Sequence, residues 1–208
     1  MILATAGCSF SWSVPETEKP PPEAAAQRVS WDDFNSDWLA AAIFAETNRM
    51  RREHDLPRLR SHRKLGGAAD LQATTVLMMG VASHHNPMAG RANVMDRVQA
   101  EGVRAQDAWE NVASTSVRVA QGGGAVRIVL NEGRRLRVDD ETGEPLTWPT
   151  YEELASRIVR QWMGSSGHRA NILQTEADYM ACGVAMGRTP LGAEVVHSVQ
   201  VFISRPSS

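Results

Sequence analysis

Cysteine and lysine are scarce in this chain of 208 residues, and long apolar runs are missing. The only cysteines are Cys8 and Cys182, so the framework of several disulfides that holds many small secreted domains together is excluded. No stretch approaches the ~20 apolar residues that a membrane-spanning helix needs. The formal net charge is −2 and the isoelectric point is about 6.3, so no overall positive field predicts a nucleic-acid partner.

The N-terminal segment MILATAGCS has a run of small residues directly before Cys8. It resembles the end of a truncated bacterial lipoprotein signal, in which the cysteine is lipidated and attaches the mature protein to a membrane. It departs from that pattern at Thr5, where leucine is usual, and lacks a charged region and a full apolar region. A free cysteine in an unstructured tail is the other interpretation of residues 1–8. Residues 9–30 hold a proline run among polar residues, which predicts an extended linker.

Residues 31–208 have the composition of one globular domain, since hydrophobic residues make up 42% of the chain. Apolar residues recur at helical spacing and predict helices within 37–55, 64–83 and 94–102. Thr150 and Glu153 have capping-box spacing, which predicts a further helix up to Met163.

Short β-prone runs separated by turn residues predict a hairpin insertion around 116–150. Two strands are expected near the C-terminus, at 182–187 and 194–204, where apolar residues alternate. Helices that come first and strands that come late indicate an α+β domain with helices flanking an antiparallel sheet.

Three segments gather polar groups: ASHHNPMAGR (82–91), AWENVA (108–113) and SSGHRANIL (165–173). Each follows or opens a regular element and is rich in turn formers, which predicts a position at a surface or cleft. Histidine and glutamate are ligands that zinc and similar divalent ions accept. His84 and His168 are too far apart for a short metal motif, so spacing alone indicates a metal site only weakly.

Taken in order, SHHNPMAGR, DRVQAEG, WENVA and WMGSSGHRANIL resemble the motifs of the bacterial branch of the CAP superfamily. This superfamily comprises the cysteine-rich secretory, antigen 5 and pathogenesis-related 1 proteins, and its domain is also called the SCP domain. The resemblance extends over about residues 38–203. It implies an α-β-α sandwich, with a central antiparallel sheet between two layers of helices and a polar cleft.

The same resemblance assigns cleft residues. The paired histidines of the family fall on His84 and His168, which implies a site for zinc or another divalent cation. The glutamate of the family's Gly-Glu-Asn motif falls on Glu110, with Asn111 beside it. Where animal and plant members have a second acidic residue, this chain has Ser165.

Departures from the pattern leave one ambiguity. Trp109 replaces the glycine of the Gly-Glu-Asn motif, and one extra residue lies between Pro87 and Arg91. A shift of the loop by one residue would put His85 in place of His84, although the alignment of Pro87 favours His84.

Several of these residues also have purely structural interpretations. Glu110 would then cap a neighbouring turn, and Asn171 is expected to tie the turn after His168 through backbone hydrogen bonds. His197 alternates with core valines and is expected to be a buried, hydrogen-bonded histidine. Cys182 is expected to be a buried thiol.

Three functions follow from these residues. The favoured one is a non-enzymatic, extracytoplasmic binding protein, secreted or anchored through lipidated Cys8, whose His/Glu cleft holds a cation and binds a small or lipid-like ligand or a protein. The second is a peptidase-like hydrolase that uses a metal-activated water or a set of Ser165, His168 and Glu110. The third is a structural cell-surface module whose cleft has no remaining function.

Overall fold

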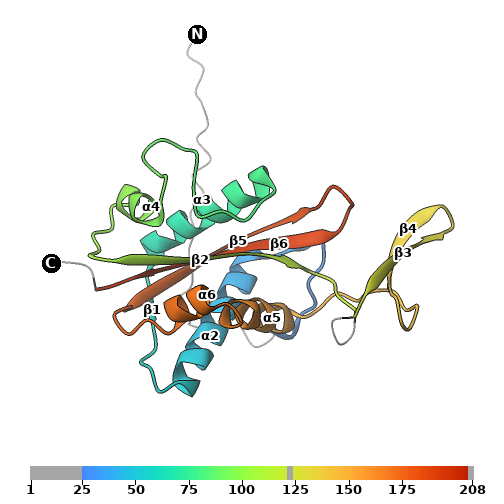
Figure 1. Ribbon diagram of the computed structural model, residues 1–208, viewed down its shortest axis with the longest axis horizontal. Helices are drawn as coiled ribbons and strands as arrows, with labels where there is room; N and C mark the ends of the chain where they lie inside the picture. The colour runs from blue at the N-terminus through green and yellow to red at the C-terminus, as the bar shows by residue number, and fades with distance from the viewer. Residues whose placement is uncertain (1–24, 121–123, 206–208) are drawn as a thin grey trace, which may run out of the picture.

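The computed structural model describes residues 25–120 and 124–205, and a four-stranded sheet forms the middle layer of the domain (Figure 1). The order across the sheet is β1-β5-β6-β2, so β2 lies at one edge. These strands are β1 (Arg60–Ser61), β2 (Ala108–Ser116), β5 (Tyr179–Arg188) and β6 (Glu194–Ile203). The two-residue β1 runs parallel to β5, and the other neighbours are antiparallel.

Helices cover both faces of this sheet (Figure 1). One layer consists of α2 (Ser36–Glu53), α5 (Tyr151–Met163) and α6 (Ser166–Ile172). The other layer consists of α3 (Arg63–Met79) and α4 (Val94–Ala100). The predicted α+β class and α-β-α sandwich are therefore confirmed.

Local capping explains where several helices begin. The Thr150 hydroxyl accepts a hydrogen bond from the Glu153 amide at 3.1 Å, and the Glu153 carboxylate accepts one from the Thr150 amide at 2.8 Å. This is the capping box that the sequence predicts. Helix α3 ends earlier than predicted because Gly80 adopts a φ of 69°, which stops the helix.

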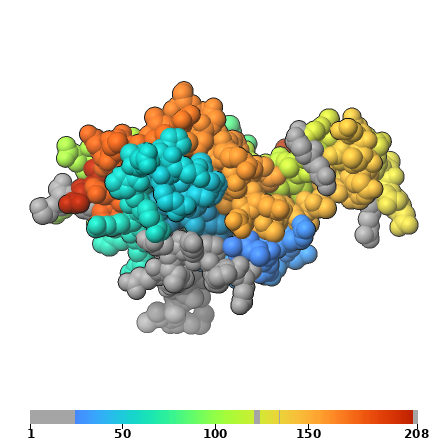
Figure 2. Space-filling view, turned by 90° about the horizontal axis from the view of Figure 1, so that it is seen from below, coloured from blue at the N-terminus to red at the C-terminus, as the bar shows by residue number. Residues whose placement is uncertain are grey.

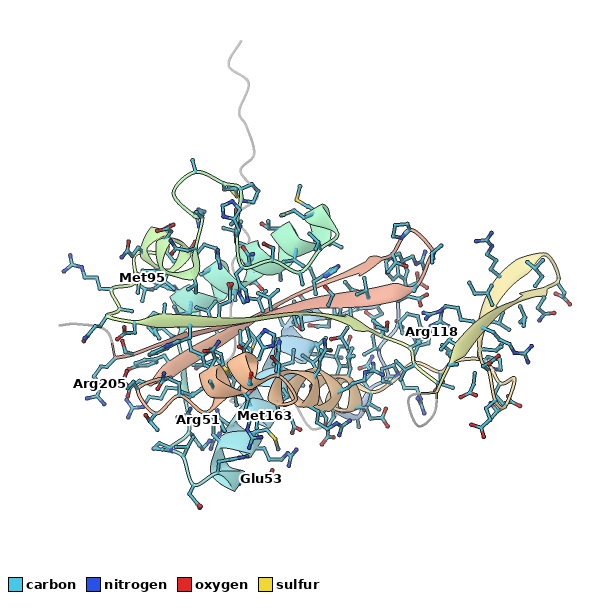
Figure 3. All side chains as sticks on the ribbon, viewed as in Figure 1. Arg51, Glu53, Met95, Arg118, Met163 and Arg205 are labelled. Atoms are coloured by element: carbon cyan, nitrogen blue, oxygen red, sulfur yellow. The ribbon has the colours of Figure 1, made fainter. Side chains whose placement is uncertain are left out.

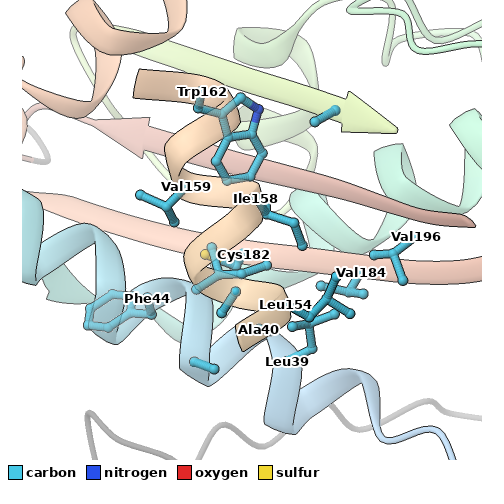
Figure 4. Close-up of a cluster of buried hydrophobic side chains, with 14 of the residues drawn as sticks. Leu39, Ala40, Phe44, Leu154, Ile158, Val159, Trp162, Cys182, Val184 and Val196 are labelled. Carbon is cyan, nitrogen blue, oxygen red and sulfur yellow. The ribbon is translucent and has the colours of Figure 1, made fainter. Parts of the chain in front are cut away.

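Because side chains alternate along a strand, the sheet has two different apolar faces. Toward α2 and α5, β5 presents Met180, Cys182 and Val184, which pack with the fully buried Trp162 (Figure 4). Cys182 is a buried free thiol, as predicted, and burial raises its pKa. Toward α3, the core is built from smaller side chains, among them Ala69 and Ala181.

The predicted insertion is a separate hairpin of β3 (Val126–Asn131) and β4 (Arg134–Asp139). It projects from one end of the body, as the yellow segment in Figures 1 and 2 shows. Two polar segments form regular elements that the sequence analysis did not assign. Residues 108–113 belong to strand β2, and the turn predicted around His168 is helix α6. Both are polar stretches whose side chains are satisfied by distant residues, which local patterns do not reveal.

Residues 25–30, at the end of the predicted linker, contact the domain. Val29 is buried and its amide donates to the carbonyl of Pro149 at 2.8 Å, while Arg28 forms a β-bridge with Thr150. The rest of the predicted linker and the lipoprotein signal at Cys8 lie outside the described residues. Within the part of the chain that the structure describes, every helix is too short or too polar to span a bilayer.

The backbone of helix α3 lies close to the sheet at Gly183. A Cβ at this position would lie 2.2 Å from the backbone carbon of Ala69, so Gly183→Ala forces the helix away from β5. We expect a loss of about 3 kcal/mol in the free energy of unfolding, measured by urea denaturation.

Gly187→Ala is the matched control on the same strand. Its Cβ would meet Cδ1 of Leu77, the end of a flexible side chain that can rotate away. The expected loss is about 1 kcal/mol. Equal losses in the two variants would contradict the close backbone packing of α3 on β5.

Candidate functional site

The site is built around the edge strand β2, beginning with Glu110 and His84. Glu110 lies on the face of β2 that α3 and α4 cover, and its side chain is only 3% exposed. His84 comes from the loop after α3, and its Nδ1 lies 2.9 Å from Glu110 Oε1. That loop is tied to α3, since Asn86 donates to Gln72 and Gln72 donates to the carbonyl of Ser83. These hydrogen bonds hold the loop against α3 independently of the contact between the imidazole and the carboxylate.

The second oxygen of Glu110 is taken by Arg97 of α4. Both side chains of this ion pair are buried, and the Arg97 guanidinium donates to Glu110 Oε2. Its NH1 also donates to the carbonyls of Arg91 at 3.2 Å and His84 at 3.4 Å. Arg97 thus holds both the carboxylate and the histidine loop. The sequence pattern did not indicate this role, although Arg97 stands in the DRVQAEG motif directly after a residue of a capping box.

His168 approaches from the other layer. It lies in α6, which packs against β2, and its ring centroid is 6.3 Å from that of His84, with 45° between the ring planes. Asn111 donates to the backbone carbonyl of His168 at 3.1 Å. Neighbouring residues of one strand therefore control the two histidines, Glu110 on one face and Asn111 on the other.

A chain of amide groups anchors Asn111 in the core. Asn171 donates both to the Asn111 side-chain oxygen at 2.9 Å and to the Glu110 carbonyl at 3.0 Å. Asn111 donates to Gln200 of β6, and Gln200 donates to the Thr47 hydroxyl of α2. Asn171 was expected to tie its own turn, but its side chain bonds to strand β2 instead.

The two imidazoles differ in their electrostatic surroundings. The hydrogen bond from His84 to the Glu110 carboxylate raises the pKa of His84, and this outweighs the opposing effects of burial and of Arg97. Burial lowers the pKa of His168, and the nearby His84 charge lowers it further. Near neutral pH, His168 is therefore the more readily available nitrogen ligand, while the Glu110 carboxylate favours a proton on His84 Nδ1.

The side chains of this site can be compared with the ligands that a metal ion requires. The described residues contain no group of three or more His, Cys, Asp and Glu side chains placed to hold an ion. Both oxygens of Glu110 are already hydrogen-bonded, so Glu110 orients His84 and is not itself a free ligand. With Nδ1 of His84 bound to Glu110, Nε2 is its remaining ligand atom. Among the residues of this site, the two imidazoles are thus the available ligands, one fewer than the three protein ligands of most open zinc sites.

The serine-based arrangement is not formed. Ser165 precedes α6 and makes no capping hydrogen bond, and no hydrogen bond joins its hydroxyl to His168 in the described ranges. Glu110 bonds to His84 and not to His168. The three residues of the hydrolase hypothesis therefore lack the hydrogen bonds of a nucleophile, a base and an orienting acid.

His85 and His197 lie outside this site. The ring of His84, and not that of the exposed His85, meets Glu110. His197 is buried, and its Nδ1 lies 2.8 Å from the hydroxyl of Ser114. The prediction of a buried, hydrogen-bonded His197 is confirmed, and burial lowers its pKa.

Replacement of Glu110 should change the titration of His84. In the parent protein, nuclear magnetic resonance should show a His84 pKa above the usual 6.5, and Glu110→Gln should move it down because the carboxylate charge is gone. The pKa of His197, which faces Ser114, should not change. A His84 pKa that is the same in both proteins would contradict this pairing.

The same shift has a consequence for stability. Because the pKa of folded His84 lies above its unfolded value near 6.5, its contribution to the free energy of unfolding is present below that pH. This contribution is lost as the pH rises through the folded pKa. His84 is largely exposed, so the effect is small and screened by salt.

Removing Arg97 should destabilise the protein strongly. Arg97→Met leaves the Glu110 carboxylate buried beside an apolar side chain, and we expect a loss of about 3–5 kcal/mol in urea denaturation. Arg49→Met removes an arginine that pairs at the surface with Glu46 and Glu53, and should cost less than about 1 kcal/mol. The double variant Arg97→Met/Glu110→Gln should recover part of the loss. Equal costs at Arg97 and Arg49 would contradict a buried pair.

A solved structure shares this fold, and two others align with lower scores. An extracellular protein of Bacillus anthracis that contains an SCP domain aligns with a TM-score of 0.52 at 20% identity, over 82% of this chain and 41% of its own. An outer surface protein of Borrelia burgdorferi aligns with a TM-score of 0.49 at 16% identity, over 78% and 90%. A cysteine-rich secretory protein of Staphylococcus aureus gives 0.47 at 16% identity, over 82% and 40%. This chain thus spans about two fifths of the Bacillus and Staphylococcus proteins.

A comparison with curated proteins finds no match. The model of the CAP family, described as the cysteine-rich secretory protein family, matches residues 44–202. This range covers more than half of the chain and includes His84, Arg97, Glu110 and His168. The chain belongs to the CAP family.

Proposed function

We propose that this domain is an extracytoplasmic binding protein whose cleft holds a divalent cation, zinc first, between His84 and His168. The observation that carries the proposal is the 2.9 Å contact between His84 Nδ1 and Glu110, beside a second imidazole whose centroid is 6.3 Å away. A carboxylate that fixes one ring nitrogen and leaves the other for the metal is a common support for histidine ligands.

The separation of the rings is close to that of a shared ion. Two imidazoles on one tetrahedral zinc ion have centroids roughly 5–5.5 Å apart, because each zinc–nitrogen bond is about 2.0–2.1 Å long. The exposed loop of His84 would therefore move by about 1 Å when the ion binds. When bound, the ion supplies a positive centre with open positions for an oxygen or nitrogen atom of a ligand. Burial, which lowers the pKa of His168, keeps that imidazole neutral and able to bind metal.

The surface near His84 supports an apolar ligand. Helix α3 and the following loop expose Met78, Met79, Val81 and Met88, and the Met78 side chain is 83% exposed. Flexible methionines suit partners of variable shape. A small or lipid-like molecule, or an apolar segment of a protein, would contact these side chains while a polar group meets the ion.

The extracytoplasmic location is supported by the comparisons. The Bacillus anthracis protein that shares the fold is described as extracellular. The small residues before Cys8 further support attachment of the mature protein to a membrane through a lipidated cysteine. In that arrangement the cleft would face the space outside the cell.

Isothermal titration with zinc chloride tests the cation site. The parent protein should bind one ion, and His84→Ala and His168→Ala should each abolish measurable binding, because two histidines supply the protein ligands. Glu110→Gln should weaken binding by about 10- to 100-fold, since it no longer orients His84. His85→Ala, a replacement of the exposed neighbour, is the matched control and should bind as the parent does.

Two outcomes would contradict the proposal. Unchanged zinc binding by His84→Ala/His168→Ala would place the ion elsewhere. No binding by the parent, with only stability altered in the variants, would favour a structural module without a working cleft.

A further inference from the structure

The hairpin forms a recess that shares no lining residue with the histidine site. It is a cavity of about 380 Å³ between the hairpin and the turn that joins β5 to β6. Arg118 lies where the hairpin leaves the body (Figure 3). The lining includes Arg118, Arg135, Arg137, Ile128, Leu191 and Glu194. Guanidinium groups and apolar side chains therefore meet in one small space.

One face of the hairpin alternates apolar and cationic side chains. Ile128 pairs with Arg137 across the strands, and Leu130 pairs with Arg135, so all four lie on the same face. Ile128 and Leu130 are 50% and 76% exposed, and Leu191 in the adjoining turn is 75% exposed. The face therefore combines projecting aliphatic side chains with two arginines.

The carboxylates next to this face are already engaged. Glu194 forms a bidentate pair with Arg118, and the distances are 2.8 Å and 3.1 Å. Asp139 accepts hydrogen bonds from the amides of Glu141 and Thr142.

The two arginines of the recess remain without an acidic partner. No ion pair joins Arg135 or Arg137 to a carboxylate of the described chain, and NH1 of Arg137 is buried without a hydrogen-bond partner there. A buried donor without an acceptor is costly, so this recess suits an oxyanion.

We propose that this face binds the phosphate headgroup of an anionic phospholipid at a membrane surface. Arg135 and Arg137 would bind the phosphate, since a guanidinium matches its oxygens. Ile128, Leu130 and Leu191 would enter the boundary between headgroups and acyl chains. The overall charge of −2 does not prevent binding to an anionic membrane. At physiological salt, charges interact over only about 8–10 Å, so the arginines near the membrane determine the attraction.

Sedimentation with vesicles tests this proposal on the full chain carrying Cys8→Ser, so that no lipid on Cys8 attaches the protein. Vesicles of phosphatidylglycerol and phosphatidylcholine should bind it, and vesicles of phosphatidylcholine alone should not. Arg135→Gln/Arg137→Gln should weaken binding by about 20- to 30-fold, since each basic residue near an anionic surface contributes about a fivefold factor. Ile128→Ser/Leu130→Ser should weaken it as well, by removing the apolar contacts.

A matched control isolates the proposed face. Arg127→Gln removes the same charge from the opposite face of the hairpin, where Arg127 pairs with Asp140 at 3.3 Å. It should bind vesicles as the parent does, and circular dichroism should show that all variants are folded.

The outcomes are decisive in either direction. Equal binding by Arg135→Gln/Arg137→Gln and Arg127→Gln would overturn the proposal, as would no binding to the anionic vesicles. Titration with inorganic phosphate separates the two sources of the anion. Phosphate binding that needs Arg137, without vesicle binding, would overturn the membrane assignment in favour of a soluble phosphate compound.

Discussion

The buried ion pair between Arg97 and Glu110 is the contact on which the rest of the site depends. Two charges that leave water need hydrogen-bond partners, because their desolvation otherwise costs several kcal/mol. Here Glu110 uses one oxygen for Arg97 and the other for His84. Arg97 also donates to two backbone carbonyls of the histidine loop, and only its Nε is buried without a partner among the described residues. The need to satisfy this pair therefore fixes helix α4, strand β2 and the loop after α3 relative to one another.

Strand β2 joins the two halves of the site because it is an edge strand with polar side chains on both faces. Glu110 points into the layer of α3 and α4, and Asn111 joins the opposite layer through Gln200. The free edge of β2 is covered by Asn171 of α6, which binds a backbone carbonyl that no neighbouring strand reaches. The same contact brings α6, and with it His168, toward His84.

Charged groups have different partners at the histidine site and on the hairpin face. At the histidine site, buried groups hold two imidazoles in place, and their surroundings raise the pKa of His84 and lower that of His168. On the hairpin, Arg135 and Arg137 remain without an acidic partner among the described residues, and exposed aliphatic side chains lie beside them. The hairpin lies outside the sandwich, so changes there leave the packing of the two cores intact.

Interactions between residues near one another in the sequence made most of the helices and the hairpin predictable. Helical spacing, the capping box at Thr150 and the turn residues of the insertion depend on neighbours in the chain, and the CAP motifs indicated His84, Glu110 and His168. The strand at 108–116, the helix around His168 and the role of Arg97 were missed. Their polar side chains are stable only because partners far away in the sequence satisfy them, such as Gln200, which lies 89 residues from Asn111. Such pairings exist only once the chain is folded, so tertiary structure alone decided them.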